Sequence, residues 1–282
     1  MTGVPAHPRL SLNQATIKYA PLATALDVTA AAGYSSIGLW REPVAEVGLA
    51  EAVRLVADSG LRVSSLCRGG FFTLVEGPER RVALDDNRRA IDEAAALGAP
   101  ALVLVAGGLP AGSRDLIGAR SRVQDALAEL APAALSAGVQ LAIEPLHPMY
   151  ASDRAVVSTL KQALDLAAPF APAAVGVVVD TFHIWWDPEV LPQIARAGAE
   201  KRIASYQVCD WATPLAADVL LSRHYVGDGV IDFTLLTEAV SAAGYTGDIE
   251  VEIFNQDVWD AEYAAVAARV ATDFAEQIAP HL

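Results

Sequence analysis

Residues 136–145 read SAGVQLAIEP and contain the pattern that decides the fold. Gly138 follows a helical stretch, a mostly apolar run comes next, and Glu144 stands immediately before Pro145. Glycine is the common residue just past a helix end, and proline favours extended backbone in the residue before it. The stretch therefore predicts a helix, a turn and a short buried strand that ends in a carboxylate.

The same device recurs along the chain, in the phrases AAGY, DSGLRV, ALGAPAL and AAGYTGDI. Apolar runs alternate with Ala/Leu/Glu/Arg stretches of helical periodicity, and eight such units in 282 residues favour a single (β/α)8 TIM barrel, one α/β domain over 1–282. An open doubly wound sheet is the main rival, but IKYAPLA at 17–23 lacks the glycine-rich turn expected after its first strand. The predicted strands are 10–17, 35–40, 61–67, 101–106, 139–144, 175–180, 203–209 and 248–254. The predicted helices are 22–32, 46–59, 81–97, 117–137, 153–168, 187–197, 231–243 and 257–278.

Composition narrows the class of protein. The formal net charge of −14 disfavours nucleic acid as a partner, because phosphate backbones are repelled by such a field. Cys67 and Cys209 make no disulfide framework, and MTGVPAHPRL shows no secretory signal pattern, so we expect a cytoplasmic protein. No apolar run reaches membrane-spanning length. If the Trp185-Trp186 loop is exposed, it would suit a contact between the subunits of a homo-oligomer.

Four predicted strands in the second half end in a group that can bind a divalent cation. These groups are Glu144, Asp180, Gln207 and Glu252, with Asp210 as a substitute or support for Gln207. The strands of a parallel barrel deliver their carboxyl ends to one face, so the four oxygen donors predict one metal site. Taken singly, each has an ordinary alternative: an ion pair, a helix N-cap or a hydrogen-bonded core amide.

Further side chains are expected to face the same mouth and bind substrate. His147 and His183 each stand three residues after an acid, in the loop that leaves its strand. Arg223 lies in the long loop SRHYVGDG, Trp40 ends the second strand, and Lys18 follows the first. Histidine can donate a hydrogen bond or shuttle a proton, and arginine suits hydroxyl or carboxylate groups. Solvated loop residues are the plain alternative for the two histidines and the arginine.

From SLNQAT at 11–16 to EVEIF at 250–254 the chain resembles the xylose isomerase-like TIM-barrel superfamily of sugar isomerases and epimerases, its inosose isomerase-like branch in particular. The resemblance implies a metal bound by Glu144, Asp180, Gln207 and Glu252, and a substrate-binding role for His183. Gln207 departs from the histidine usual in that family, and Pro-Leu-His-Pro after Glu144 replaces an Asn-Arg pair of the ketose 3-epimerases.

These residues predict a metal-dependent isomerase or epimerase acting on a keto-sugar or inosose, with Mn²⁺, Mg²⁺ or Co²⁺ as the cofactor. Glu144 and Glu252 are the predicted catalytic pair, moving a carbon-bound proton through a metal-bound enediolate. Loss of a leaving group from the same intermediate makes a lyase or dehydratase on a keto-sugar, keto-glycoside or cyclic keto acid the alternative. A non-catalytic sugar-binding subunit is a further one. An abasic-site endonuclease of this fold is disfavoured by the charge and by only five histidines.

Overall fold

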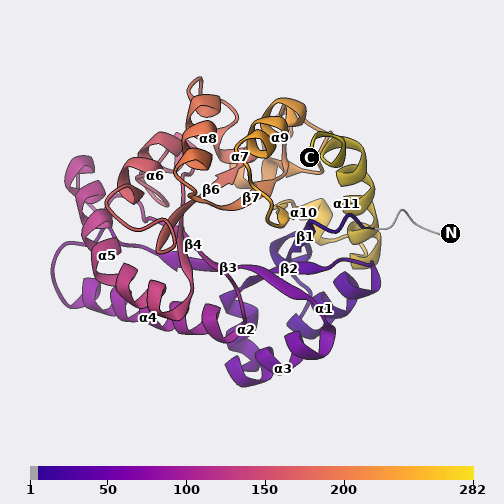
Figure 1. Ribbon diagram of the computed structural model, residues 1–282, viewed down its shortest axis with the longest axis horizontal. Coiled ribbons are helices and arrows are strands. Elements are labelled where there is room, and N and C mark those ends of the chain that lie inside the picture. The colour runs from indigo at the N-terminus through magenta and orange to yellow at the C-terminus, as the bar shows by residue number, and fades with distance from the viewer. Residues whose placement is uncertain (1–5) are drawn as a thin grey trace.

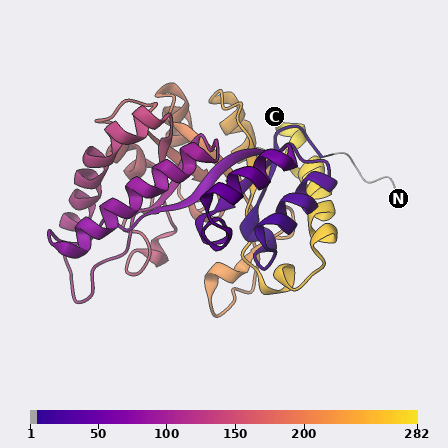
Figure 2. The same ribbon diagram turned by 90° about the horizontal axis from the view of Figure 1, so that it is seen from below.

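The computed structural model describes residues 6–282, so residues 1–5 of the predicted domain lie outside the described part. Eight parallel strands form a closed barrel in the order β1-β10-β7-β6-β5-β4-β3-β2, and the helices surround it (Figure 1). This confirms the predicted TIM barrel. α1 and α11, from the two ends of the chain, lie side by side and complete the ring (Figures 1 and 2). No helix of residues 6–282 is long and apolar enough to cross a bilayer.

The barrel strands are β1 (Leu10–Asn13), β2 (Ser36–Trp40), β3 (Arg62–Gly70), β4 (Ala101–Val105), β5 (Gln140–Glu144), β6 (Val175–Asp180), β7 (Ile203–Val208) and β10 (Ile249–Val251). The α-helices are α1 (Leu22–Ala31), α2 (Arg41–Val47), α3 (Leu49–Ser59), α4 (Pro78–Ala96), α5 (Leu116–Ala137), α6 (Leu160–Ala167), α7 (Thr181–Ile184), α8 (Val190–Ala199), α9 (Phe233–Ala242), α10 (Gln256–Trp259) and α11 (Tyr263–Gln277). A small antiparallel pair, β8 (Asp210–Trp211) and β9 (Arg223–His224), stands apart from the barrel.

Local hydrogen bonds explain where the predicted boundaries were wrong. The first strand stops at Asn13 because its side chain accepts from the amide of Ala15 and starts a 3-10 turn. The helix predicted at 153–168 begins only at Leu160, where Thr159 Oγ1 accepts from Gln162 N at 3.2 Å. The helix predicted at 46–59 is divided into α2 and α3 at Gly48, whose φ is +84°.

The last two predicted elements also differ from the structure. The strand predicted at 248–254 is regular only over Ile249–Val251. The helix predicted at 257–278 is two helices, α10 and α11, because Asn255 and Glu262 each cap a separate N-terminus with their side-chain oxygens.

The interior of the barrel is divided into an apolar and a polar half. Small apolar side chains of β4, β5 and β6 pack together on one side. On the other side, Ser36, Ser11, Glu250 and Gln207 are register neighbours across β2, β1, β10 and β7, and all four are buried. The outward residues of the same strands, such as Leu12 and Val251, belong to the large core under the helices. Polar groups thus enter the barrel from one arc of strands and lead up to the mouth.

Candidate active site

A cavity of about 650 Å³ opens at the carboxyl ends of the strands. Its lining includes Glu144, Glu252, His183 and Arg223, which come from the end of β5, the residue after β10, the short helix α7 and strand β9. All four side chains are buried. Closure of the barrel therefore collects the predicted strand-end residues around one space, as the parallel topology requires.

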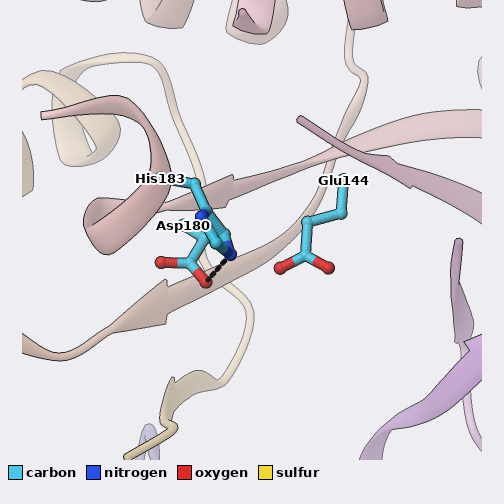
Figure 3. Close-up of side chains that lie close together, drawn as sticks. All are labelled: Glu144, Asp180 and His183. Carbon is cyan, nitrogen blue, oxygen red and sulfur yellow. Dashed lines mark ion pairs between the residues drawn. The ribbon is translucent and has the colours of Figure 1, made fainter. Parts of the chain in front are cut away.

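Glu144, Asp180 and His183 form the tightest group in the site. Their candidate ligand atoms all lie within 4.8 Å of one another. Figure 3 shows the carboxylate of Glu144 directed toward Asp180 and His183, which stand together on the adjoining segment. Glu144 and Asp180 were predicted as ligands from the sequence, whereas His183 was predicted only to bind substrate.

Asp180 uses its two oxygens differently. Oδ1 accepts from the amide of Phe182 at 2.8 Å and caps α7, which was the ordinary alternative for this residue. Oδ2 lies 3.3 Å from Nη1 of Arg223 and receives no well-directed hydrogen bond. A buried carboxylate oxygen that accepts no hydrogen bond is costly, so Oδ2 is a position at which a bound cation would be stabilised.

Arg223 is the central cation of the site. Its Nη1 donates to Oε2 of Glu252 at 2.7 Å, and its guanidinium stacks between the rings of Phe182 and Phe254 at 4.8 and 5.1 Å. Only 2% of the residue is exposed, so the surface alternative considered for it is wrong. One guanidinium thus faces the three buried carboxylates of Glu144, Asp180 and Glu252, leaving a net negative site.

Two hydrogen-bond donors meet the imidazole ring of His183. The amide of His147 donates to Nδ1 at 3.2 Å, and Nη2 of Arg223 lies 2.9 Å from Nε2. A neutral imidazole accepts at one nitrogen only, so the tautomer of His183 determines which of the two contacts is a hydrogen bond. The backbone amide and the guanidinium, which Glu252 also binds, together hold the ring in place beside Glu144 and Asp180.

Burial dominates the acid–base properties of the site. It raises the pKa of Glu144 well above the ordinary value, and the charges of Asp180 and Glu252 raise it further. Burial also raises the pKa of Asp180, and that of Glu252 to about 7, although Arg223 acts against both increases. The pKa of His183 is lowered well below its usual value by burial and then by Arg223. Such displaced values are typical of functional sites.

The residues present fit a divalent cation. Gln207 is a register neighbour of Asp180 on β7, is 2% exposed, and its Oε1 lacks a hydrogen-bond partner. Together with Oδ2 of Asp180 and the carboxylates of Glu144 and Glu252, it makes a donor set of oxygens. Hard cations such as Mg²⁺ and Mn²⁺ prefer such sets. The ligand role of each residue remains a prediction.

The other predicted residues divide into two groups. Lys18 and Trp40 line the cavity. His147 does not line it: its ring packs against Trp186 and Trp211, with centroids 5.3 Å away in each case, and its amide orients His183. These contacts give His147 a supporting role, and the substrate-binding role predicted for it stays a prediction.

Asp210 is a structural anchor. Its Oδ1 accepts from the amides of Trp211 and Ile231, and its Oδ2 accepts from those of Gly227 and Gly229. All four contacts lie between 2.8 and 3.1 Å. The GDG segment therefore wraps a carboxylate of its own chain, and these contacts account for Asp210 without the role beside Gln207 that the sequence suggested.

The tryptophan pair at the end of α7 is not exposed either. Trp185 and Trp186 are both half-buried. The ring of Trp185 packs 5.6 Å from that of Trp211, and Nε1 of Trp186 donates to the carbonyl of His183 at 2.8 Å. The pair therefore supports the site from behind, and the homo-oligomer stays a prediction.

Sequence reasoning missed several lining residues. Cys67 and Arg68 lie within β3, which runs past the predicted end at 67, and Arg154 lies in a segment predicted to be helical. Leu220 and Phe254 complete one wall. The available signal was position alone, since these residues fall at or after strand ends, where barrels place their sites.

Comparison with known proteins identifies the family. Residues 26–273 match the family model of the xylose isomerase-like TIM barrel. The chain belongs to this family. The resemblance inferred from strand-end residues is thereby confirmed, and the cavity of this xylose isomerase-like barrel lies on the face where such barrels carry their chemistry.

Two curated relatives are 3-dehydroshikimate dehydratases. That of Pseudomonas aeruginosa is 32% identical over 242 residues, covering 82% of this chain and 36% of the relative. That of Pseudomonas putida is 29% identical over 239 residues, covering 82% and 35%. The chain thus spans about a third of the length of the curated relatives that it matches.

Solved structures agree on the fold. A crystal structure of a protein from Sinorhizobium meliloti 1021 is 48% identical, with a TM-score of 0.92 over 95% of this chain and 98% of the other. The IOLI protein with a bound zinc atom has a TM-score of 0.84 at 19% identity, covering 97% and 99%. L-ribulose 3-epimerase has 0.78 at 19%, covering 98% and 96%. At such low identities, the last two show a shared fold only.

Proposed function

We propose that this barrel is a divalent-metal-dependent dehydratase acting on a cyclic keto acid of the 3-dehydroshikimate type. The 32% identical relative named for that reaction supports it. A lyase or dehydratase was the alternative to the isomerase or epimerase first expected from the sequence. The charged side chains that line the cavity favour the dehydratase over the isomerase or epimerase.

The placement of charge in the cavity carries this proposal. Glu144 and Glu252 are buried in it, whereas three cations, Lys18, Arg68 and Arg154, line it where side chains reach solvent. Two exposed acids, Glu42 and Glu46, line the same part, and Glu42 lies 3.8 Å from Arg68, so Lys18 and Arg154 are the cations left to meet a substrate. Nζ of Lys18 lies 4.3 Å from the Trp259 ring, and Cζ of Arg154 lies 5.1 Å from the Tyr150 ring. Aromatic faces thus hold two of these cations in place. A neutral sugar has no group that would pair with them, whereas a keto acid has a carboxylate.

Side chains of this site suit each step of a dehydration. A bound divalent ion would polarise the substrate ketone as a Lewis acid. Glu144 and Glu252 are the candidates to remove the proton from the carbon beside the ketone. His183 would contact the hydroxyl on the next carbon and orient it. As the C–H and C–O bonds break, a C=C bond forms, and the hydroxide leaves as water with the proton that the glutamate removed from carbon.

The isomerase or epimerase remains the second candidate because of where the two acids stand. Glu144 ends β5 and Glu252 follows β10, and β6 and β7 separate these strands in the barrel. The two carboxylates therefore face the cavity from different sides, an arrangement that suits proton removal at one face and return at the other.

Incubation with candidate substrates in deuterated water tests the proposal. The purified protein with Mn²⁺ is given 3-dehydroshikimate or a panel of ketoses and inososes, and products are followed by mass and by ultraviolet absorbance. We expect the keto acid to lose one water and form an aromatic product, and a chelator to stop the reaction. Deuterium uptake or epimer formation on a ketose, with no loss of water from the keto acid, would instead establish the second candidate.

A further inference from the structure

A second buried acid, Glu250, lies two residues before Glu252 on the same barrel strand, below the cavity floor. It is 1% exposed, and neither the proposed metal site nor the proposed acid–base chemistry uses it. Oε2 of Glu250 accepts from Nδ2 of Asn13 at 2.9 Å. Glu250 is therefore connected to the end of the neighbouring strand β1 through an amide side chain.

Asn13 extends this connection to the wall of the cavity. Its Oδ1 accepts from the indole Nε1 of Trp40 at 2.8 Å and from the amide of Ala15 at 3.0 Å. Trp40 lines the cavity, and its ring meets that of Phe254 edge to face with centroids 5.6 Å apart. Phe254 in turn stacks on the guanidinium of Arg223. One chain of contacts thus runs from the buried acid to the pocket wall.

Glu250 determines which way the Asn13 amide points. If the amide were turned over, its NH2 group would face the N–H groups of Trp40 and Ala15, and its oxygen would face the carboxylate of Glu250. Both arrangements are repulsive. An acceptor at position 250 therefore keeps Oδ1 toward Trp40 and fixes the plane of the indole.

Strand β2, which ends at Trp40, leaves room for the side chains of Glu250 and Asn13. A Cβ atom placed on Gly38 would collide with Oε2 of Glu250 and would lie 3.0 Å from Nδ2 of Asn13. Gly38 is the register neighbour of Asn13 on β2. The carboxylate and the amide thus pass directly over a position where any side chain would separate them.

We propose that Glu250 is a positioning residue, which acts through Asn13 to hold the Trp40 indole in the pocket wall and so favours flat, ring-shaped substrates. The proposal rests on the proposed function only for the choice of ring ligand. The orientation of Trp40 itself does not depend on which reaction the site performs.

Exchanging donor and acceptor in the hydrogen bond between Asn13 and Glu250 tests whether Glu250 positions Trp40. Asn13→Asp sets two carboxylates against each other, so we expect it to shift the indole N–H signal of Trp40 in ¹⁵N NMR spectra. It should also weaken binding of 3,4-dihydroxybenzoate, the expected aromatic product, by about tenfold. Adding Glu250→Gln supplies an N–H donor to the new acceptor, and we expect the double variant to recover both the signal and the affinity. Glu250→Gln alone still offers an acceptor and should change little.

The outcomes separate the two proposals. Trp40→Phe identifies the indole signal among the five tryptophans. If that signal moves in Asn13→Asp and returns in the double variant while the wild type does not bind the ring acid, the positioning role stands and the proposed substrate is wrong. A Trp40 signal that is unchanged in Asn13→Asp, or a double variant no better than Asn13→Asp in signal and affinity, would overturn the positioning role.

Discussion

Three carboxylates share one guanidinium at the floor of the cavity. Arg223 lies 2.7 Å from Glu252 and 3.3 Å from Asp180, and Glu144 completes the acidic set. A single positive charge cannot balance three buried negative charges in a medium of low dielectric constant. Burial is the main cause of the raised pKa values of the three acids, and the charge deficit gives the site its capacity to take up a cation.

The pH dependence of proton exchange is the test at this scale. Burial raises the pKa of Glu252 to about 7, and a base must be ionised to accept a proton. A bound cation stabilises the ionised carboxylate, so with Mn²⁺ present the rate of exchange of the carbon-bound proton should rise with pH and level off at or below about 7. Glu252→Gln should lower the rate by about 10²–10⁴-fold and remove the rise. The exposed Glu238→Gln is the control, and an unchanged rate in Glu252→Gln would exclude Glu252 as the base.

The element that presents Arg223 is an irregular connection rather than a barrel strand. β8 and β9 pair Trp211 with Arg223, and the chain then returns to the barrel through Gly227 and Gly229. Four amides of this connection converge on the carboxylate of Asp210. A Cβ atom on Gly229 would collide with that carboxylate, so glycine is required there.

Replacing the anchor should loosen this element. Asp210→Asn keeps one acceptor oxygen but turns an NH2 group toward two backbone donors. We expect the free energy of unfolding to fall by about 1–3 kcal/mol. The turnover rate should also fall under conditions in which the variant is still folded, because Arg223 belongs to the anchored segment. Denaturant titration and turnover assays measure both, with the exposed Asp257→Asn as the control. Equal stability of Asp210→Asn and wild type would show that the four contacts contribute nothing.

On the scale of the whole molecule, closure of the barrel makes one site from residues far apart in the chain. The apolar half of the interior packs under β4, β5 and β6, while the polar half leads to Gln207 and Glu252. Glu144 and Glu252 are 108 residues apart in sequence yet line one cavity. A ligand that contacts several strand ends therefore stabilises the whole folded barrel against unfolding.

Metal binding should stabilise the entire domain. An ion that binds only the folded state at 100 times its Kd adds about 2.7 kcal/mol to the free energy of unfolding. After dialysis against a chelator, we expect Mn²⁺ to raise the melting temperature of the wild type but not of Glu144→Gln. Scanning calorimetry with Mn²⁺, Mg²⁺, Co²⁺ and Zn²⁺ measures this shift. If none of the four ions raised the melting temperature, the metal site would be disproved.

Much of the fold followed from local signals. The apolar runs place all eight strands, glycine after a helix marks the approach to five of them, and Pro145 after Glu144 marks one strand end. Errors arose where side-chain caps decide a boundary, as at Asn13 and Thr159. Such caps depend on a single hydrogen bond, which periodicity does not reveal.

The sequence by itself determined the barrel and the acids at its mouth, because hydrophobic periodicity and helix stops act between near neighbours in the chain. Only the tertiary structure decided that Arg223 is buried among those acids, that Asp210 anchors a loop, and that Glu250 reaches Trp40 through Asn13. These contacts join segments far apart in sequence, and their geometry exists only once the strands have closed into a ring.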